Sequence, residues 1–363
     1  MILHVISGLG MGGAERNLFQ VAKALQRQGL EQHVVSVSDR GVWAEEFTKQ
    51  GIEVTPLGVR AKSSVLIGLY RLVRLVNRLK PHVIQGWMYH GDLFAAFAHR
   101  LALGRNRRLL FWNLRASNMN LGGYSTIIHL NAWLSRWPDL IIANSRAGFD
   151  SHLAQGYRPR RFEVISNGID IEAFRPDPFM RAKVREEFGI SSEAILAIHV
   201  ARIDPMKDHA SFLAAMEKLP QVRGLMIGKG TEMLKAPANV LALGLRRDLP
   251  RFYAAADIVV STSIYGEGFS NVLAEGMSCG LVPIATDVGD ARIIIGDTGA
   301  IMAPRDVEAL INLIAVEVVR SIPDRQARGM QARDRIVHNF ASAKAAEAFA
   351  RLYAPNNTAL NQT

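Results

Sequence analysis

Short apolar runs alternate with helical stretches along the first half of this chain. The runs fit β-strands because they are short and rich in Val, Ile and aromatic residues. The stretches between them, such as residues 14–29 and 65–79, repeat apolar residues at helical spacing. The expected strands are ILHVIS (2–7), HVVSVS (33–38), VTPLG (54–58), HVIQGW (82–87), RLLFWNLR (108–115) and LIIANS (140–145). This alternation predicts a parallel sheet with helices on both faces.

The same alternation starts again in the second half. The expected strands there are AILAIHVA (194–201), GLMIG (224–228), VLALG (240–244), IVVSTS (258–263) and VPIAT (282–286). Between the two series, residues 166–179 contain Gly, Asp and two prolines, as is typical of a hinge. We therefore expect an α/β protein of two Rossmann-like domains that share one cleft, because ligands bind at the carboxyl ends of parallel strands.

Domain bounds follow from these two series. We expect a first domain over residues 1–168, a linker over 169–190, a second domain over 191–335, and a C-terminal helix and tail over 336–363. The alanine-rich stretch 336–352 is the expected helix of that tail.

The positive charge is concentrated in the first half. Of the 43 Lys and Arg and 33 Asp and Glu, residues 1–170 hold 21 and 11, which leaves 22 of each for the remainder. This asymmetry indicates a large anionic partner for the first domain, either nucleic acid or anionic lipid. No nucleic-acid-binding module or interleaving of aromatic and basic residues is present, so we expect no nucleic acid partner.

Cysteine content and hydropathy suggest a reducing compartment. The chain has a single cysteine, Cys279, and so no internal disulfide. Its start lacks a basic region followed by an apolar core, and nowhere do 18 apolar residues run together. We expect a cytoplasmic protein.

A glycine-rich loop follows the first expected strand. Gly8, Gly10 and Gly13 match G-x-G-x-x-G, and Asp39 ends the second strand, as in a dinucleotide site. An NAD-dependent oxidoreductase is therefore one alternative. Glu15 argues against it, since its carboxylate lies in the first helical turn, where it would repel a pyrophosphate.

Two cations follow the first strand of the second series. Arg202 and Lys207, in HVARIDPMKD, lie on the loop before the next helix. Two cations at a strand's carboxyl end suit a diphosphate. The alternative is a pair of solvated surface charges.

The stretch GEGFSNVLAEGMSCG (266–280) carries two carboxylates near a helix start. Glu267 lies on the loop, and Glu275 lies one to two turns into the helix. Backbone N–H groups over 269–272 suit phosphate or hydroxyl oxygens, and each carboxylate can accept from a pair of vicinal hydroxyls. The alternatives are an exposed loop acid for Glu267 and a satisfied core acid for Glu275.

Taken together, these motifs resemble glycosyltransferase family 4. The resemblance covers nearly the whole chain in the correct order, and the two glutamates eight residues apart are its most specific part. It is carried by SGLGMGGAE, SNGID, VARIDPMKD, LGLRRDLPRFYAAADIVVSTS and GEGFSNVLAEGMSCGLVPIATDVGD. It implies the two-domain GT-B fold, with an acceptor-binding first domain, a nucleotide-sugar-binding second domain, and a C-terminal helix that returns to the first domain.

The resemblance also implies a role for each candidate residue. Glu275 binds the donor ribose, Glu267 binds the transferred sugar, and Arg202 and Lys207 neutralise the leaving diphosphate. His90 would face the donor sugar, with a purely structural hydrogen bond as the alternative; Asp92, two residues on, is a weaker candidate. The remaining donor-site residues are Gly12, Gly13, Leu245 (base), Phe269, Ser270 and Asn271 (backbone amides).

The same resemblance implies retaining, front-face chemistry in which the leaving phosphate deprotonates the acceptor hydroxyl. No His, Cys or Asp set has zinc-ligand spacing, and no Asp-x-Asp ends a strand in the sugar region. We expect no metal and no cofactor, with a nucleotide sugar, UDP-linked, as co-substrate.

A basic surface on the first domain suggests a membrane. Residues 65–79 carry Arg71, Arg74 and Arg78 on one helical face. Further cations, Arg100, Arg105, Arg107 and Arg108, follow. They suit an anionic membrane surface, with Trp133 and Trp137 as anchors and Arg115 as an acceptor contact. The alternative is a packed helix with solvated arginines.

These expectations combine into one function. We expect a retaining, metal-independent hexosyltransferase that transfers a sugar to a glycan or lipid-linked glycan in bacterial surface polysaccharide synthesis (O-antigen, capsule or exopolysaccharide), on the cytoplasmic face of the inner membrane. The alternatives are the NAD-dependent oxidoreductase and a non-catalytic, membrane-associated protein that binds sugar nucleotides.

Overall fold

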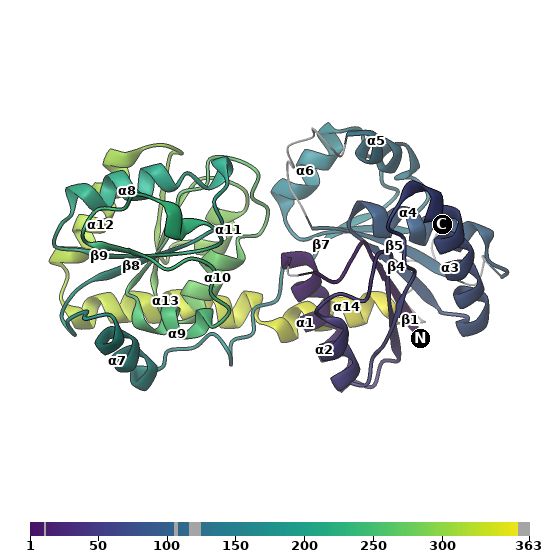
Figure 1. Ribbon diagram of the computed structural model, residues 1–363, viewed down its shortest axis with the longest axis horizontal. Coiled ribbons are helices and arrows are strands. Elements are labelled where there is room, and N and C mark those ends of the chain that lie inside the picture. The colour runs from purple at the N-terminus through teal and green to yellow at the C-terminus, as the bar shows by residue number, and fades with distance from the viewer. Residues whose placement is uncertain (11, 105–107, 116–124, 355–363) are drawn as a thin grey trace. The chain divides into compact units, whose positions relative to one another are not determined.

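Two compact α/β units make up the protein in a computed structural model, which describes residues 1–10, 12–104, 108–115 and 125–354 (Figure 1). The first unit is Met1–Gly168 together with the segment that begins at Ser342, and the second is Ile169–Ala341. Each unit contains one sheet whose strand pairs are all parallel. The predicted α/β class with two parallel sheets is therefore confirmed.

The first sheet has the strand order β3-β2-β1-β4-β5-β6-β7. Its strands are β1 (Ile2–Ile6), β2 (Gln32–Ser36), β3 (Glu53–Pro56), β4 (Val83–Trp87), β5 (Leu109–Leu114), β6 (Leu140–Ala143) and β7 (Phe162–Val164). Its helices are α1 (Gly13–Arg27), α2 (Ala44–Lys49), α3 (Val65–Leu79), α4 (Met88–Leu101), α5 (Ser125–Leu134), α6 (Arg146–Ala154) and α14 (Ser342–Tyr353).

Helices cover both faces of this sheet, so its central strands are buried throughout. One core lies between the sheet and α3, α4, α5 and α6, and the other between the sheet and α1, α2 and α14. In α3, Leu72, Leu75 and Val76 face the core. Gly68 lies so close to Val59 that a Cβ would come within 2.4 Å of its Cγ2 atom.

The second sheet has the order β10-β9-β8-β11-β12-β13. Its strands are β8 (Leu196–Val200), β9 (Arg223–Ile227), β10 (Val240–Ala242), β11 (Ile258–Ser261), β12 (Val282–Thr286) and β13 (Ala300–Met302). Its helices are α7 (Pro178–Glu187), α8 (His209–Lys218), α9 (Leu249–Ala255), α10 (Asn271–Ser278), α11 (Ala291–Ile295), α12 (Val307–Val319) and α13 (Ile322–Phe340). Short 3₁₀ turns lie at Lys62–Ser64, Pro205–Lys207 and Thr231–Met233.

The expected linker is part of the second unit. Ile169, Phe174, Val184 and Ile190 are buried in the core of that unit. Residues 169–190 also include α7, whose N-terminus is capped by the Asp177 carboxylate. The turn residues that indicated a hinge therefore begin a packed segment of the second unit.

The expected C-terminal helix is two helices. α13 ends at Phe340, Ala341 has extended backbone, and α14 begins at Ser342. α14 packs in the first unit, where Phe349 lies in the core and the Tyr353 hydroxyl donates to Gln85. The break arises because residues 336–341 pack with the second unit and α14 with the first.

Candidate active site

The donor-site candidates lie at the carboxyl edge of the second sheet. Chain order reverses between β8 and β11, since β9 and β10 lie on one side of this pair and β12 and β13 on the other. Such a reversal is where ligands bind in open parallel sheets. The loop after β8 carries Arg202 and Lys207, and the loop after β11 carries Glu267. The topology thus brings these three residues to one place.

Glu267 is the centre of this site. Its Oε1 atom is paired with Nζ of Lys207 and accepts a hydrogen bond of 2.7 Å from the Ser263 hydroxyl. Oε2 makes no hydrogen bond to any residue in the described part of the chain. The carboxylate is thus held through one oxygen, and Oε2 can act as a hydrogen-bond acceptor. Ser263 was not among the predicted site residues, although it lies only four residues from Glu267.

The glutamate loop is fixed by a glycine on the next strand–helix connection. Gly289 has φ +63°, and a Cβ there would lie 2.6 Å from the carbonyl oxygen of Glu267. The next residue, Asp290, donates its backbone N–H to Gly268 O at 3.0 Å. These contacts hold the main chain at Glu267 in place.

A buried histidine supports Lys207 from beneath. Nε2 of His199 lies 3.0 Å from Oγ1 of Thr262, which donates to the backbone oxygens of Lys207 and Asp208 at 2.8 and 2.9 Å. The pKa of His199 is lowered to about 3, mainly by burial and to a smaller extent by the nearby His209 and Lys207. The imidazole is therefore neutral, and it adds no positive charge beneath the lysine.

Arg202 is exposed and only locally paired. Its guanidinium donates to Oδ2 of Asp204 at 2.6 Å, and 63% of its side chain is exposed. Burial raises the pKa of Asp204, but hydrogen bonds from Met206 N and Arg202 outweigh that effect and leave the pKa below its ordinary value. An exposed ion pair is weak, so Arg202 is free to exchange Asp204 for a phosphate.

The N-terminus of α10 faces the same edge. Its first residue is Asn271, and the preceding Ser270 makes no side-chain cap. Its first N–H groups thus lack that common partner and suit an anion or hydroxyl. Phe269 is buried, with its ring centre 5.3 Å from that of Phe340, so its side chain anchors the loop. A ligand contact from its backbone stays a prediction.

Glu275 lies in the second turn of α10 and is 2% exposed. Its negative charge contributes, after burial, to the raised pKa of the Cys279 thiol. The adjacent Gly276 packs directly on β11, where a Cβ would lie 2.6 Å from Cβ of Val259. The helix is therefore tightly seated on the sheet, which fixes the direction of the Glu275 side chain.

Leu245 lies beyond β10 on the same edge. Its side chain is 55% exposed, and Gly244 before it has φ +69°. Gly228, after β9, donates to Gly244 O at 2.9 Å, and a Cβ on Gly228 would lie 1.9 Å from the carbonyl oxygen of Ala201. The loops after β8, β9 and β10 thus contact one another through main-chain atoms. The Gly228–Lys229–Gly230 turn was not predicted, although glycines around a cation after a strand are a recognisable signal.

In the first unit, the corresponding reversal lies between β1 and β4. Gly12 and Gly13 follow β1, and His90 follows β4 in the first turn of α4. Gly91 packs against β1, with its N–H 3.4 Å from Oγ of Ser7, so the start of α4 and the end of β1 are in contact. The predicted first-unit candidates are thus brought to one edge.

His90 is presented by an unusual backbone turn. Met88, the first residue of α4, has φ 65°, which residues other than glycine rarely adopt. The His90 side chain is exposed, yet partial desolvation lowers its pKa. Asp92, by contrast, is fully buried, accepts from Asn113 N at 3.3 Å, and has a pKa raised well above its ordinary value by burial. The buried position of Asp92 and its hydrogen bond to β5 indicate a structural role.

Glu15 lies at the N-terminus of α1, where the pyrophosphate of a dinucleotide would bind. Its carboxylate lies against Gly12, where a Cβ would be 2.3 Å from Oε2. Burial raises the pKa of Glu15, and a hydrogen bond with its own backbone lowers it in part. This arrangement favours a structural role for the carboxylate and argues against a pyrophosphate at α1.

Arg115 lies within the first unit rather than on an open surface. Its guanidinium is 5.0 Å from the ring centre of Trp87 and 5.7 Å from that of Phe349, and Nη1 donates to Asn167 at 2.7 Å. Burial lowers its pKa to about 9. Stacking on Trp87 of β4 and Phe349 of α14 explains the position of Arg115. Its contact with an acceptor stays a prediction.

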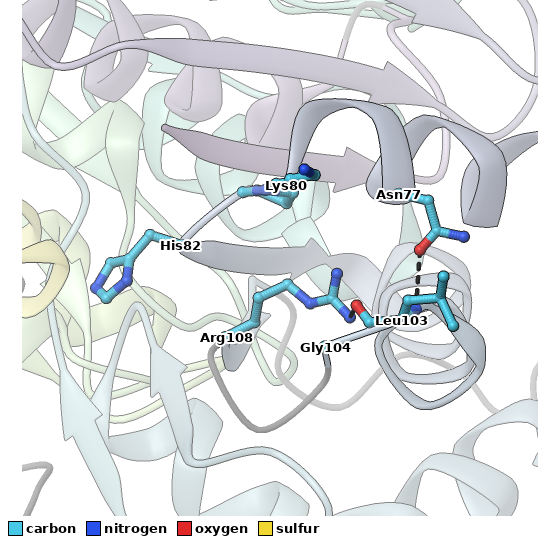
Figure 2. A pocket seen from close by; sticks show the side chains of 7 residues that line it. Asn77, Lys80, His82, Leu103, Gly104 and Arg108 are labelled. Atoms are coloured by element: carbon cyan, nitrogen blue, oxygen red, sulfur yellow. Dashed lines mark hydrogen bonds between the residues drawn. The ribbon is translucent and has the colours of Figure 1, made fainter.

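Arg108 corrects part of the predicted membrane face. It is buried, and Nη2 donates to the carbonyl oxygens of Ala102 and Leu103 at 3.1 and 2.6 Å, which end α4 (Figure 2). A buried cation that caps a helix end is not available to a membrane. Arg105 and Arg107 lie outside the described residues.

Arg108 also lines a pocket of about 490 Å³ at the amino edge of the first sheet, the edge opposite the one that carries His90. Asn77 accepts from Leu103 N there at 2.8 Å, and Figure 2 shows the His82 ring directed away from Arg108. At this pocket, Asn77 and Arg108 thus make hydrogen bonds within the first unit.

Within the described ranges, no group of three or more His, Cys, Asp or Glu side chains is arranged to hold a metal ion. None of the helices described is both long enough and apolar enough to cross a membrane.

Two family descriptions match the chain. Residues 11–173 match the family described as Glycosyltransferase Family 4, and residues 194–316 match Glycosyl transferases group 1.

Curated relatives carry the name D-inositol 3-phosphate glycosyltransferase. The protein of Mycobacterium sp. (strain KMS) is 34% identical over 167 residues, which cover 41% of this chain and 37% of the relative, so the match spans little more than a third of that protein. The protein of Mycobacteroides abscessus is 29% identical over 357 residues, which cover 85% of this chain and 77% of the relative.

Among solved structures, Anabaena Alr3699/HepE in complex with UDP is similar. It has a TM-score of 0.83 and 23% identity, and the match covers 97% of this chain and 98% of that one. At this level of identity the likeness concerns the fold.

Proposed function

Because this chain belongs to family 4 of the glycosyltransferases, we propose that it transfers a hexose from a UDP-linked sugar to a glycan or lipid-linked glycan, with retention of anomeric configuration. One observation carries the proposal: Lys207 and Ser263 hold a single oxygen of Glu267 at the strand reversal of the second sheet. Its other oxygen is left for a sugar hydroxyl.

The nucleotide diphosphate of the donor is held by groups of the second unit. Arg202, Lys207 and the N-terminus of α10 provide positive charge for the diphosphate. Glu275 accepts from the ribose hydroxyls, and the backbone at Leu245 holds the base. UDP as the nucleotide is supported by the similar Anabaena protein, whose structures include complexes with UDP and with UDP-glucose.

Chemistry proceeds on one face of the donor sugar. The bond between the anomeric carbon and the diphosphate oxygen breaks, and the leaving oxygen takes the proton of the acceptor hydroxyl that attacks from the same side. Arg202 and Lys207 stabilise the negative charge that develops on the diphosphate. Glu267 orients the sugar, and His90 contributes a hydrogen bond from the first unit. These cations replace a divalent ion, so the reaction is metal-independent.

The acceptor belongs to the synthesis of a bacterial surface polysaccharide, at the cytoplasmic face of the inner membrane. Support comes from the cationic first unit, which holds most of the excess positive charge. A phosphorylated polyol is a second candidate acceptor, because the curated relatives are named for D-inositol 3-phosphate.

A ligand screen tests the donor class. The purified protein is heated with UDP, GDP, ADP and NAD, and a bound nucleotide raises Tm by mass action. Selective stabilisation by UDP is expected, and stabilisation by NAD alone would contradict the proposal.

Transfer from radiolabelled UDP-glucose is then measured with and without a chelator. Turnover separates a transferase from a protein that only binds, and a loss restored by magnesium would refute metal independence.

A further inference from the structure

Three helices on one face of the first unit, α3, α4 and α5, contain almost no acidic residues. Residues 54–138 contain twelve lysines and arginines and a single acid, Asp92. Asp92 lies in α4 and is fully buried. The cations of α3 and α4 therefore have no exposed carboxylate on α3, α4 or α5 beside them, whereas Asp150 of α6, on the same face, is paired with Arg146. Such a surface suits a flat anionic partner.

The first two turns of α3 carry apolar side chains that are exposed to solvent. Leu66 is 78% exposed, Ile67 54% and Tyr70 62%. Their spacing places them side by side on one helical face, opposite the residues that pack in the core. Scattered exposed apolar residues are ordinary, but three adjacent ones on a helix mark an interaction site.

Cations border this apolar patch on both sides. Lys62 precedes it, and Arg74 follows it, with its guanidinium 5.9 Å from the ring centre of Tyr70. Neither cation is within ion-pair distance of a carboxylate in the described chain, in keeping with the lack of acids here. Apolar side chains flanked by cations on a helix at the surface are typical of proteins that lie in the interface of an anionic bilayer.

A second group of exposed apolar residues lies at the other edge of the first sheet from the α3 patch. Because α3 follows β3 in a parallel sheet, its N-terminus lies at the carboxyl edge, as the His90 loop does. Leu101 and Leu103, 60% and 80% exposed, lie at the end of α4 on the amino edge. A lipid-linked acceptor has to reach the carboxyl edge, where ligands bind. The α3 patch is therefore the one that serves the reaction.

We propose that the first two turns of α3 are the membrane anchor, with Leu66, Ile67 and Tyr70 inserted at the acyl boundary of an anionic bilayer and Lys62 and Arg74 on lipid phosphates. This inference rests on the proposed function in assuming a membrane-borne acceptor. It replaces the expected cluster at Arg105–Arg108, since Arg108 is buried, and it assigns the occupant as lipid rather than protein.

Vesicle sedimentation of the full chain tests the anchor. The vesicles contain phosphatidylcholine with either 30 or 0 mol% phosphatidylglycerol, on the order of the anionic content of natural membranes. Leu66→Ser/Ile67→Ser is expected to weaken binding to anionic vesicles at least about tenfold, because two inserted side chains are lost. Lys62→Gln/Arg74→Gln is expected to weaken binding to the anionic vesicles and to reduce its salt dependence.

Leu101→Ser/Leu103→Ser is the matched control, since it removes two equally exposed apolar side chains from the other edge. It is expected to bind as the unsubstituted protein does. The proposal is overturned if the α3 variant binds unchanged, if the control loses binding instead, or if the unsubstituted protein does not bind anionic vesicles. Thermal unfolding of each variant verifies its folding.

Stabilisation by UDP is measured on the same samples. It is expected to be equal in all variants, because the donor site lies in the second unit. Vesicle binding without any response to UDP would contradict the proposed function and leave the anchor standing. A response to UDP without vesicle binding would support the proposed function and contradict the anchor.

Discussion

Lys207 and Glu267 form an ion pair between the loops that follow two adjacent strands, although sixty residues separate them in the chain. The pair is partly buried, with 19% and 14% of the two side chains exposed. A carboxylate and an ammonium held this way are positioned before a ligand arrives. We expect a bound diphosphate to place a second anion beside Lys207, while Glu267 keeps the Ser263 hydroxyl as its orienting contact.

Glu267→Gln tests the role of the carboxylate. The amide keeps the size of the side chain but loses the charge and one acceptor, so kcat is expected to fall about 100-fold or more, as when a preorganised electrostatic group is removed. UDP affinity is expected to stay within about threefold, because the nucleotide contacts lie elsewhere. Ser263→Ala keeps the carboxylate and is expected to lower kcat less. Turnover of Glu267→Gln at the unsubstituted rate would exclude this role.

The diphosphate clamp is tested by comparing UDP with uridine in calorimetry. Lys207→Gln and Arg202→Gln are each expected to weaken UDP binding about tenfold or more, since each removes a charge-assisted contact. Uridine binding is expected to be unchanged, because uridine carries no phosphate. Lys218→Gln, on the exposed end of α8, is the control. Equal losses for UDP and uridine would show a general structural effect instead.

Much of this site could be predicted because it depends on local sequence. Apolar runs mark strands, ligand loops follow strand ends, and the family motifs fix the order of the loops, so Arg202, Lys207, Glu267 and Glu275 were assigned without a structure. The predicted family is confirmed by the two matching family descriptions. The parallel sheets are confirmed as well.

What could not be predicted depends on three-dimensional contacts that the sequence pattern does not show. Arg108 lies in an arginine-rich stretch, and the sequence does not show that its guanidinium donates to the carbonyl oxygens of Ala102 and Leu103 just after α4. In α3, residues 65–70 are almost all apolar, so periodicity does not tell the buried side from the exposed one. β7 and β13 were missed because each has only three residues. The link from His199 through Thr262 to Lys207 joins three segments.

Glu275 is expected to determine affinity for the nucleotide. Glu275→Gln keeps the volume of this buried side chain and removes its charge, so UDP binding is expected to weaken about tenfold or more, because a charged acceptor for ribose hydroxyls is lost. Binding of 2′,3′-dideoxy-UDP, which lacks those hydroxyls, is expected to be the same in variant and unsubstituted protein. Calorimetry with UDP and with 2′,3′-dideoxy-UDP measures the affinity of the variant and of the unsubstituted protein for each ligand. Equal weakening for the dideoxy compound would contradict the ribose contact.

The stability of the second unit is expected to depend on pH through His199. The pKa of this histidine is about 3 in the folded protein and about 6.5 when unfolded, so the unfolded state alone takes up its proton between these values. The free energy of unfolding is therefore fully retained above about pH 6.5 and decreases as the pH falls, by up to about 1.4 kcal/mol per pH unit from this residue.

Urea denaturation at pH 7, 6 and 5 measures this dependence. His199→Gln has no titrating group at this position, so its free energy of unfolding is expected to fall less steeply on acidification, even where it starts from a lower value at pH 7. His129→Gln, at an exposed position on α5, serves as the control and is expected to follow the unsubstituted protein. If His199→Gln also follows it, the folded protein accepts the proton at His199 at its ordinary pKa, and the imidazole beneath Lys207 is charged within the physiological range. That charge would repel Lys207, so the ion pair with Glu267 would weaken on acidification together with donor binding.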